Sequence, residues 1–570
     1  MVRPIKALSE TKSYAIPPRP DYIDLPLGNT ERLFMSQPEQ EALDDAWQDA
    51  ARDAAGLYPD ARPLEAALAG ELGIEPSRVI VTAGADEALE RACKAVLEPG
   101  RTLLLPTPTF AMIPHYAKLT GADIVTVPNT DDGMDWPALH AACDERTAAI
   151  AVISPNNPTG RVVDLESFLA FAEAFPHVLC IFDGAYAEFA DEDPIARLIE
   201  EPNIVVVRTM SKAWGLPGLR VGYAAGQAQV VDWMRATSGP YTVSHSSLKL
   251  AEACLSAGQE RKAAFVANVR RERDQLRAAL EACGFSVEPS QANFLFATIE
   301  DGKANVWDRC LASLGIGVRR FGGELMNSIR VSCPGTPEGL TRVVSALETI
   351  HRPDALIFDM DGVMVDVAAS YRSAIIETAK AFGVTVTRED IAARKARGNA
   401  NNDWVVTLDL ILEAGGTATL EAVTETFERL YQGTAEHPGL RETEKLVAPR
   451  AYYESLRDRF KLGIVTGRPR QDAEFLLNLH GLSDLFDSVV CMEDAALKPS
   501  PDPVLLACSQ LGTKRAWMFG DTPDDIRAAR AAGVLPIGVV APGEDPVRAT
   551  TILESVGASK VIGSIIDWEK

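Results

Sequence analysis

One stretch of the chain, residues 207–223, combines side chains that could bind a phosphate group and attack a carbonyl carbon. These are Thr209, Ser211, Lys212 and Arg220, and glycines between them let the backbone approach a ligand. A lysine among such groups can have a lowered pKa and form a Schiff base, while hydroxyls and an arginine bind a phosphate dianion. Pyridoxal phosphate needs both functions, so the stretch predicts a site for this cofactor.

Buried strands with polar ends would have to position these residues. Residues 204–207 are a continuous apolar run directly before the lysine stretch, and two earlier apolar runs lead to Asn157 and Asp183. In an open α/β sheet, ligands bind at the carboxyl ends of the strands, so these side chains would meet there. Lys212 taken alone would more commonly be a surface lysine after a strand, and the motifs that accompany it argue against that interpretation.

Four motifs occur in an order and spacing that resemble the fold-type I aminotransferases, and among them histidinol-phosphate aminotransferase and its relatives. The motifs are Ala-Gly-Ala-Asp-Glu at 83–87, Asn-Asn-Pro-Thr-Gly at 156–160, Phe-Asp-Gly-Ala-Tyr at 182–186, and the stretch around Lys212. The resemblance extends over residues 14–350. It implies a large and a small α/β domain, a pyridoxal phosphate cofactor and a homodimer with shared sites.

The resemblance also implies a role for each matching residue. Lys212 would be the catalytic lysine, and Asp183 would pair with the protonated pyridine nitrogen, which makes the ring an electron sink. The residues expected to bind the cofactor are Ala85, Asp86, Phe110, Asn157, Asp183, Tyr186, Thr209, Ser211, Arg220 and, from the partner subunit, Tyr58. Arg330 and Arg319 are expected to bind the carboxylate or phosphate of the substrate.

Two positions depart from the family pattern. The segment that lies near the substrate carboxyl group in the family, at the end of an expected N-terminal arm, is here Gly-Asn-Thr-Glu-Arg at 28–32, which leaves the amino acceptor open. The glutamate that usually follows the aspartate is Gly184. Because that glutamate is not the electronic partner of the ring, we expect the chemistry to survive.

A second set of reactive residues begins just after residue 352. The apolar run 355–358 ends in Asp359 and Asp361, and residues two apart in extended backbone share a side, so both carboxylates face one site. Two carboxylates there require a cation or different roles. Further residues of this kind lie near later apolar runs, namely Thr466, Lys498, Asp521 and Asp525. The order of these motifs resembles the haloacid dehalogenase superfamily of phosphatases.

In that resemblance Asp359 would be the nucleophile that forms an aspartyl phosphate, and Asp361 the general acid and base. Thr466 and Lys498 would bind the phosphoryl group. The residues expected at a magnesium ion, which prefers hard oxygen ligands, are Asp359, Asp361, Asp521 and Asp525. Residues 368–446 would form a helical cap, in which the polar segment 394–403 is either a specificity loop or an ordinary helix connection.

Composition narrows the class of protein. The chain has 570 residues, 46% of them hydrophobic and 24% charged, which suits a globular protein of at least two domains. A formal net charge of −24 argues against nucleic acid or an anionic membrane as a partner. Nine cysteines are scattered without a CxxC motif, and the N-terminus lacks an apolar signal core, so we expect a protein of the reducing cytoplasm.

We therefore predict an α/β chain with an aminotransferase of fold type I at 1–352 and a Rossmann-like haloacid dehalogenase domain with a helical cap at 353–570. The predicted reactions are glutamate-dependent conversion of an oxo phosphate to an amino phosphate, and magnesium-dependent hydrolysis of that product. Imidazole acetol phosphate, giving histidinol phosphate, is the leading substrate. Two alternatives stay open: a decarboxylase of a phosphorylated amino acid in the first module, and one module serving as a silent regulatory domain.

Overall fold

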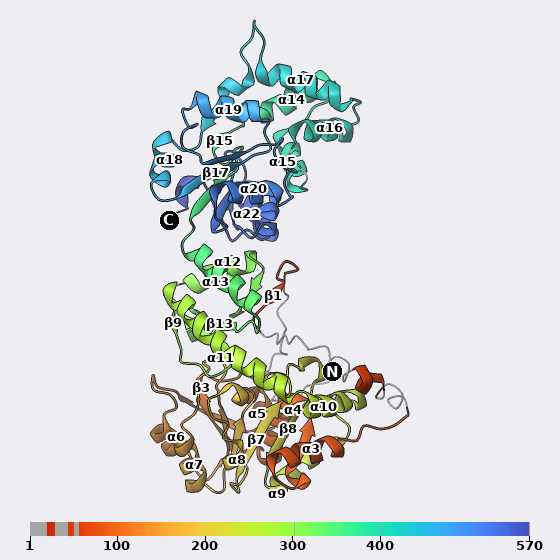
Figure 1. Cartoon of the computed structure of the whole chain (residues 1–570), viewed down its shortest axis with the longest axis vertical. Coiled ribbons are helices and arrows are strands. Elements are labelled where there is room, and N and C mark those ends of the chain that lie inside the picture. Colours follow the sequence, from red (N-terminus) through yellow and green to blue (C-terminus); the bar gives the residue numbers. More distant parts are fainter. Residues whose placement is uncertain are drawn as a thin grey trace. The chain divides into compact units, whose positions relative to one another are not determined.

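The computed structural model describes residues 20–28, 44–48, 50, 56–300, 302–398, 400 and 402–568 (Figure 1). Most of the expected N-terminal arm and residues 29–32 of the segment near the substrate carboxyl group lie outside the described residues. The chain divides into two compact units. The first comprises Leu27–Ile299 and Arg319–Thr341, and the second comprises Glu300–Val318 and the chain from Arg342 onward, with a short stretch that ends at Pro26.

A seven-stranded sheet forms the centre of the first unit, in the order β2-β8-β7-β6-β5-β3-β4. Its strands are β2 (Val79–Thr82), β3 (Thr102–Thr107), β4 (Asp123–Pro128), β5 (Thr147–Ile153), β6 (Leu179–Asp183), β7 (Ile204–Thr209) and β8 (Gly222–Gly226). All neighbours are parallel except β8, which is antiparallel to both β2 and β7. The apolar runs that end near Asn157, Asp183 and Lys212 are therefore adjacent strands, as predicted.

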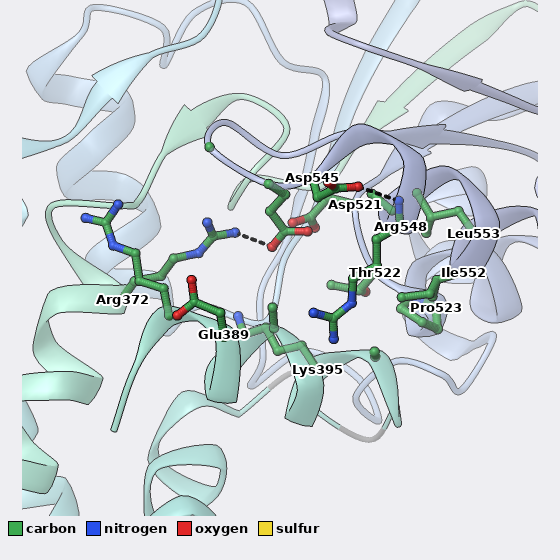
Figure 2. Close-up of a pocket in the computed structure, with 16 residues that line it drawn as sticks. Arg372, Glu389, Lys395, Asp521, Thr522, Pro523, Asp545, Arg548, Ile552 and Leu553 are labelled. Atoms are coloured by element: carbon green, nitrogen blue, oxygen red, sulfur yellow. Dashed lines mark hydrogen bonds and ion pairs between the residues drawn. The ribbon is translucent and has the colours of Figure 1, made fainter. Parts of the chain in front are cut away.

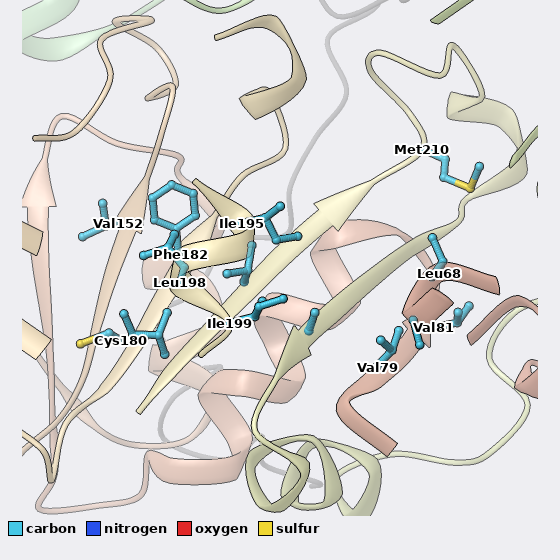
Figure 3. Close-up of a cluster of buried hydrophobic side chains, with 14 of the residues drawn as sticks. Leu68, Val79, Val81, Val152, Cys180, Phe182, Ile195, Leu198, Ile199 and Met210 are labelled. Atoms are coloured by element: carbon cyan, nitrogen blue, oxygen red, sulfur yellow. The ribbon is translucent and has the colours of Figure 1, made fainter. Parts of the chain in front are cut away.

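Apolar layers cover both faces of this sheet, which explains why its central strands are continuously hydrophobic. One layer packs side chains of β5, β6 and β7 against the helices α3 (Arg62–Leu72), α7 (Leu165–Ala174) and α8 (Ile195–Leu198). Figure 3 shows part of it, with Val152, Phe182 and Leu198 together. The opposite layer includes α4 (Gly84–Val96), α5 (Met112–Leu119) and α9 (Ala228–Ala236).

A smaller antiparallel sheet in the same unit has the order β12-β13-β10-β9. Its strands are β9 (Ser286–Val287), β10 (Phe294–Thr298), β12 (Arg319–Arg320) and β13 (Ser328–Ser332). The helices α10 (His245–Ala257) and α11 (Gln259–Ala282) precede it. Arg319 and Arg330 are directly paired in the β12–β13 register, so the two arginines predicted to bind substrate are neighbours.

The second unit contains a parallel sheet in the order β18-β17-β14-β19-β20-β21. Its strands are β14 (Ala355–Phe358), β17 (Lys461–Val465), β18 (Ser488–Val490), β19 (Ala516–Gly520), β20 (Leu535–Val539) and β21 (Lys560–Ile562). Its helices are α18 (Arg450–Arg457), α19 (Arg470–Leu479), α20 (Asp502–Leu511), α21 (Pro523–Ala531) and α22 (Pro546–Ser555). Because β14 lies between β17 and β19, the ends that carry Asp359, Thr466 and Asp521 meet.

The insertion after β14 is helical, as expected of a cap. It contains α14 (Tyr371–Ala381), α15 (Arg388–Ala396), α16 (Asp403–Glu413) and α17 (Leu420–Gln432). Two short strands connect it to the sheet domain, β15 (Val365–Asp366) and β16 (Lys445–Leu446), and they pair with each other in antiparallel fashion. We call this pair, together with the preceding Glu444, the hinge.

The second unit also contains α12 (Lys303–Ser313), most of α13 (Pro337–His351), and β1 (Leu25–Pro26) paired with β11 (Ile316–Gly317). The helix α12 contacts β20 and β21, which accounts for its place in this unit. The predicted division between residues 352 and 353 falls just before β14 and stays a prediction about the functional modules. Within the described parts of the chain, no helix is both long enough and apolar enough to cross a membrane.

Candidate active sites

The lysine site lies at the carboxyl ends of β5, β6 and β7. The strand register pairs Ile153 with Asp183 and Asp183 with Val207, so the segments that follow these strands leave the sheet side by side. The Nζ atom of Lys212 lies 5.3 Å from the centre of the Tyr186 ring. The structure therefore brings together Lys212, Tyr186 and Asp183, which sequence reasoning assigned to one cofactor.

Asp183 is a buried carboxyl group whose surroundings disfavour its charged form. Burial chiefly raises its pKa to about 7, and the nearby Asp86 adds to this effect, whereas Arg208 and Lys212 oppose it. Its Oδ1 accepts one hydrogen bond, from the backbone N–H of Ala185 at 3.0 Å. A cationic ring nitrogen bound next to Asp183 would supply the missing opposite charge. This carboxyl group thus fits a protonated pyridine.

The start of α4 lies close to the start of β8 and to the backbone of Arg208, just before the Thr209–Ser211 segment. A Cβ atom on Gly222 would lie 2.6 Å from the backbone nitrogen of Ala85, so only glycine allows β8 to approach the start of α4 this closely. The Oγ1 of Thr209 donates to the Oγ of Ser211 at 3.0 Å. Free N–H groups at a helix start, two hydroxyls and a nearby arginine suit a phosphate group.

Arg220 is the arginine expected at that phosphate. It has the left-handed backbone conformation, with φ of 52°, and its Nη2 lies 3.1 Å from the Oδ2 of Asp86. Asp86 also accepts a hydrogen bond from the Tyr116 hydroxyl at 3.2 Å. The structure thus joins Asp86 and Arg220, although they are 134 residues apart in sequence.

Arg330 connects the small sheet to the predicted cofactor residues. Its Nη1 donates to the Oδ1 of Asn157 at 2.7 Å, and its Nη2 donates to the backbone oxygen of Gly28. The guanidinium carbon lies 4.8 Å from the centre of the Phe294 ring. Arg330 is buried, and Arg319 lies opposite it in the neighbouring strand. This position at the edge of the lysine site suits an arginine that binds the anionic end of a substrate.

For two predicted cofactor residues, Tyr58 and Phe110, the structure shows the packing of the side chain but does not test the contact with a cofactor. Tyr58 is 79% exposed and stacks on the exposed Tyr241, with ring centres 4.8 Å apart. An exposed aromatic pair of this kind is compatible with the expected contact in a partner subunit. Phe110 is half-buried and packs against the apolar layer that contains α4, and its stacking on a cofactor ring stays a prediction.

The space beside Asp183 contains a residue that sequence reasoning missed. Arg208, whose side chain is 2% exposed, makes an ion pair with Glu188 at 3.4 Å and another with Asp193. A Cβ atom on Gly184 would lie 3.0 Å from the Arg208 Nε atom. The arginine therefore occupies space next to position 184, which explains why glycine is compatible there. An arginine within an apolar strand was the only signal for it.

An acidic cluster lies at the centre of the parallel sheet in the second unit. Carboxylate oxygens of Asp359, Asp521 and Asp525 lie within 4.8 Å of one another. Gly362, with φ of +76°, follows the first of these, and a Cβ atom there would lie 2.2 Å from the Oδ2 of Asp521. The turn after β14 therefore needs glycine both for its backbone conformation and for the approach of Asp521.

Lys498 is the cation that directly contacts this cluster. Its Nζ donates to the Oδ1 of Asp359 at 2.8 Å and to the Oδ1 of Asp525 at 2.5 Å. Burial chiefly raises the pKa of Asp359 to about 7 and that of Asp521 well above its ordinary value, with neighbouring carboxylates adding to both. One lysine does not offset three carboxylates. A divalent cation with oxygen ligands would, so the residues present fit Mg²⁺.

The four predicted metal residues differ in how free their oxygens are. The Oδ2 of Asp525 accepts hydrogen bonds from the Thr522 N–H at 3.0 Å and from its hydroxyl at 2.6 Å, in a capping box at the start of α21. With Lys498 at its other oxygen, Asp525 is placed to orient that lysine. Asp361 is not part of the carboxylate cluster, and its Oδ1 accepts instead from Arg468. Its role in proton transfer stays a prediction.

Comparison with known proteins identifies the first module. Residues 27–347 match the family model of aminotransferase class I and II. The chain belongs to this aminotransferase family. Residues 353–533 match the model of haloacid dehalogenase-like hydrolases, so the chain carries two enzyme modules. The predicted resemblance to these two families and the predicted fold class are confirmed.

Individual relatives of this chain have different functions by name. An imidazoleglycerol-phosphate dehydratase of Phytophthora nicotianae is 46% identical over 37% of this chain. The chain spans about half, 52%, of that relative's own length. An aromatic amino acid aminotransferase of Thermobifida fusca is 36% identical over 56% of this chain and 88% of its own. A histidinol-phosphate aminotransferase of Ruegeria pomeroyi is 33% identical over 52% of this chain and 84% of its own.

A solved structure shows the same fold for the aminotransferase module. The histidinol-phosphate aminotransferase of Sinorhizobium meliloti, in complex with pyridoxal-5'-phosphate, superimposes with a TM-score of 0.54 at 24% sequence identity. The match covers 61% of this chain and 99% of that one.

The cap of the hydrolase module contributes charged residues beside the acidic cluster. A cavity of about 170 Å³ is lined by Lys395 of α15 and by Asp521, together with Arg372, Arg388 and Arg548 (Figure 2). Burial disfavours the charge of Lys395, but the carboxylates of Asp403 and Asp521 outweigh it and raise the pKa of this lysine. The cap thus places a cation within electrostatic reach of the residue predicted to bind the metal.

The described residues of the polar segment 394–403 contact Asp524, the neighbour of Asp525, and one another. The Oδ2 of Asp524 accepts a hydrogen bond from the backbone N–H of Ala400 at 3.0 Å, and the Nζ of Lys395 lies 3.1 Å from the Oδ1 of Asp403. Asp403 and Trp404 line a second, small cavity next to Asp361. Both alternatives for this segment, a specificity loop or an ordinary helix connection, stay predictions.

Proposed function

We propose that this chain is a bifunctional enzyme that transfers an amino group from glutamate to an oxo phosphate and then removes the phosphate from the aminated product. The observation that carries the proposal is the presence of two assembled sites in one chain, one around Lys212 and Asp183 and the other around Asp359 and Lys498. A silent regulatory module would be expected to lose one of these residues. We further propose a homodimer, with Tyr58 reaching the partner's site, in the cytoplasm, where the nine free cysteines would stay reduced.

Imidazole acetol phosphate is the proposed oxo substrate, and histidinol phosphate the product. The names of two relatives support this choice, because they refer to histidinol phosphate and to imidazoleglycerol phosphate. Arg330, with Arg319 beside it, supplies the positive charge that a phosphate group or a donor carboxylate requires.

In the first site, pyridoxal phosphate would supply an electron sink for removal of the substrate α-proton. Lys212 would hold the cofactor through its amine and would move the proton at the substrate α-carbon. Asp183 would hold the pyridine nitrogen in its protonated form. The start of α4 with Thr209, Ser211 and Arg220 would bind the cofactor phosphate, while Asn157 and Tyr186 would bind the ring hydroxyl.

In the second site, a carboxylate oxygen of Asp359 would attack phosphorus while the bond from phosphorus to the ester oxygen breaks. Asp361 would give a proton to the departing alcohol and then take one from the water that hydrolyses the aspartyl phosphate. Thr466 and Lys498 would bind phosphoryl oxygens. Mg²⁺, held by Asp359, Asp521 and the Asp361 backbone oxygen, would neutralise charge on the phosphoryl group.

The experiment that tests the first activity offers glutamate with either imidazole acetol phosphate or an aromatic oxo acid, and measures 2-oxoglutarate. We expect faster turnover with the oxo phosphate. Preference for the aromatic oxo acid would instead favour an aromatic amino acid aminotransferase, which is the function of the Thermobifida fusca relative by name. Release of carbon dioxide from a phosphorylated amino acid would instead show a decarboxylase.

A further inference from the structure

Arg468 lies on the loop after β17, and its side chain is only 1% exposed. All of its N–H donors make hydrogen bonds within the protein. A guanidinium group has five N–H donors in a fixed fork. Nε and Nη2 donate to the Oδ1 of Asp361 at 2.8 and 2.5 Å, and Nη1 donates to the hydroxyl of Tyr431 at 3.1 Å. The two remaining bonds, from Nη1 and Nη2, go to the two carboxylate oxygens of Glu444, each at 2.9 Å.

The acceptors come from three parts of the second unit. Asp361 belongs to the turn after β14, Glu444 is the hinge residue before β16, and Tyr431 lies in the cap helix α17. The Tyr431 hydroxyl also donates to Glu444 at 3.1 Å, and the guanidinium lies over the ring of Tyr371 in α14, 4.7 Å from its centre. Arg468 thus connects the proposed proton donor to both the hinge and the cap.

We propose that Arg468 is a positioning residue of the phosphatase, which fixes the carboxyl group of Asp361 so that its second oxygen faces the leaving group. Both bonds from Arg468 to Asp361 go to Oδ1, so Oδ2 is the oxygen left for proton transfer. Glu444, with an exposed fraction of 0%, and Tyr431 hold the guanidinium from the opposite side. Without these contacts, the Asp361 side chain could rotate away from the ester oxygen.

This inference rests on the proposed phosphatase and predicts a dependence on the leaving group. When the phosphoryl group of an alkyl phosphate is transferred to Asp359, the departing alkoxide must be protonated. When p-nitrophenyl phosphate reacts, the departing p-nitrophenolate is stable without a proton from the enzyme. The ratio kcat/KM reports the first, phosphoryl-transfer step for both esters. A fault in Asp361 orientation should therefore lower kcat/KM for histidinol phosphate much more than for p-nitrophenyl phosphate.

The test measures both ratios in two variants of the full chain with Mg²⁺. Arg468→Lys keeps the charge but loses the fork, and should lower kcat/KM for histidinol phosphate about 30-fold or more, with less than about a threefold change for the aryl ester. Tyr431→Phe removes one hydroxyl from the cluster and should give the same selectivity at a smaller size. It keeps the test decisive if Arg468→Lys fails to fold.

Arg470→Lys is the matched control, because this arginine lies two residues further on, is more exposed, and pairs with Glu474 and Asp494 away from Asp361. It should change neither ratio. Equal losses on both esters in a folded variant, or no loss on either, would overturn the positioning role. The phosphatase assignment is judged separately by Asp359→Asn, which must stop phosphate release from both esters whatever Arg468 does.

Discussion

At the scale of single residues, each of the two sites contains a buried carboxyl group whose burial disfavours the charged form. Burial raises the pKa of Asp183 and of Asp359 to about 7. In each case the structure suggests the cation that would restore the charged form, a pyridinium nitrogen at Asp183 and Mg²⁺ at Asp359. Binding of such a cation should therefore lower the pKa of each carboxyl group.

Lys212 is the residue on which the aminotransferase assignment depends. Lys212→Ala should abolish the yellow colour of the protein incubated with pyridoxal phosphate, and with it amino transfer, because the nucleophilic amine is gone. Absorbance spectra and 2-oxoglutarate formation measure the two effects. Lys249→Ala, which removes a lysine that pairs with Glu252, is the control and should leave both unchanged. Full amino transfer in Lys212→Ala would show that the assignment is wrong.

Asp403 is the residue on which substrate choice by the phosphatase should depend. We expect its carboxylate to meet the ammonium group of the amino phosphate, exchanging its contact with Lys395 for one with substrate. Asp403→Asn should raise KM for histidinol phosphate about tenfold, roughly one lost charge-assisted hydrogen bond, and change KM for the oxo form little. Steady-state kinetics with both esters measures this. A similar rise in both KM values would contradict a specific contact with the ammonium group.

At the scale of elements, the close approach of Asp521 to the turn between β14 and the hinge can be tested by substituting Gly362 in that turn. Gly362→Ala should reduce phosphate release at least tenfold, because the added Cβ would lie 2.2 Å from the Asp521 oxygen. Gly543→Ala is the matched control, since Gly543 also has a positive φ of 79° but no atom within 4 Å of the added carbon. Both variants carry a similar backbone cost of about 1 kcal/mol. Equal activity in the two variants would mean that the Asp521 approach is unimportant.

Elements were the part of the structure most accessible from sequence. The apolar run 355–358 became β14 with the predicted bounds, and the run that leads to Asp183 became β6, because buried parallel strands must be continuously hydrophobic. The helical cap was likewise predicted. The pair of Arg468 with Glu444 and that of Lys395 with Asp403 were not, since such contacts depend on how the cap packs and leave no periodic signal in the chain.

At the scale of the whole molecule, the two chemistries should be separable. Chelation of Mg²⁺ by EDTA, or the substitution Asp359→Asn, should stop phosphate release and leave amino transfer within a few-fold, because the lysine site uses no metal in this account. Parallel assays of phosphate and 2-oxoglutarate measure this. Asp484→Asn, at an exposed ion pair with Arg450, is the control for the substitution. If either treatment stopped both reactions equally, the two modules would be coupled.

The central claim is that the amino phosphate made at Lys212 is the substrate hydrolysed at Asp359. The most direct measurement compares phosphatase turnover on matched oxo and amino phosphates in the Lys212→Ala variant, in which no amino transfer can interconvert them. The account predicts faster hydrolysis of the amino phosphate, because the phosphate group is needed by the first site and must leave last. Equal rates on both esters, or faster hydrolysis of the oxo form, would contradict that order.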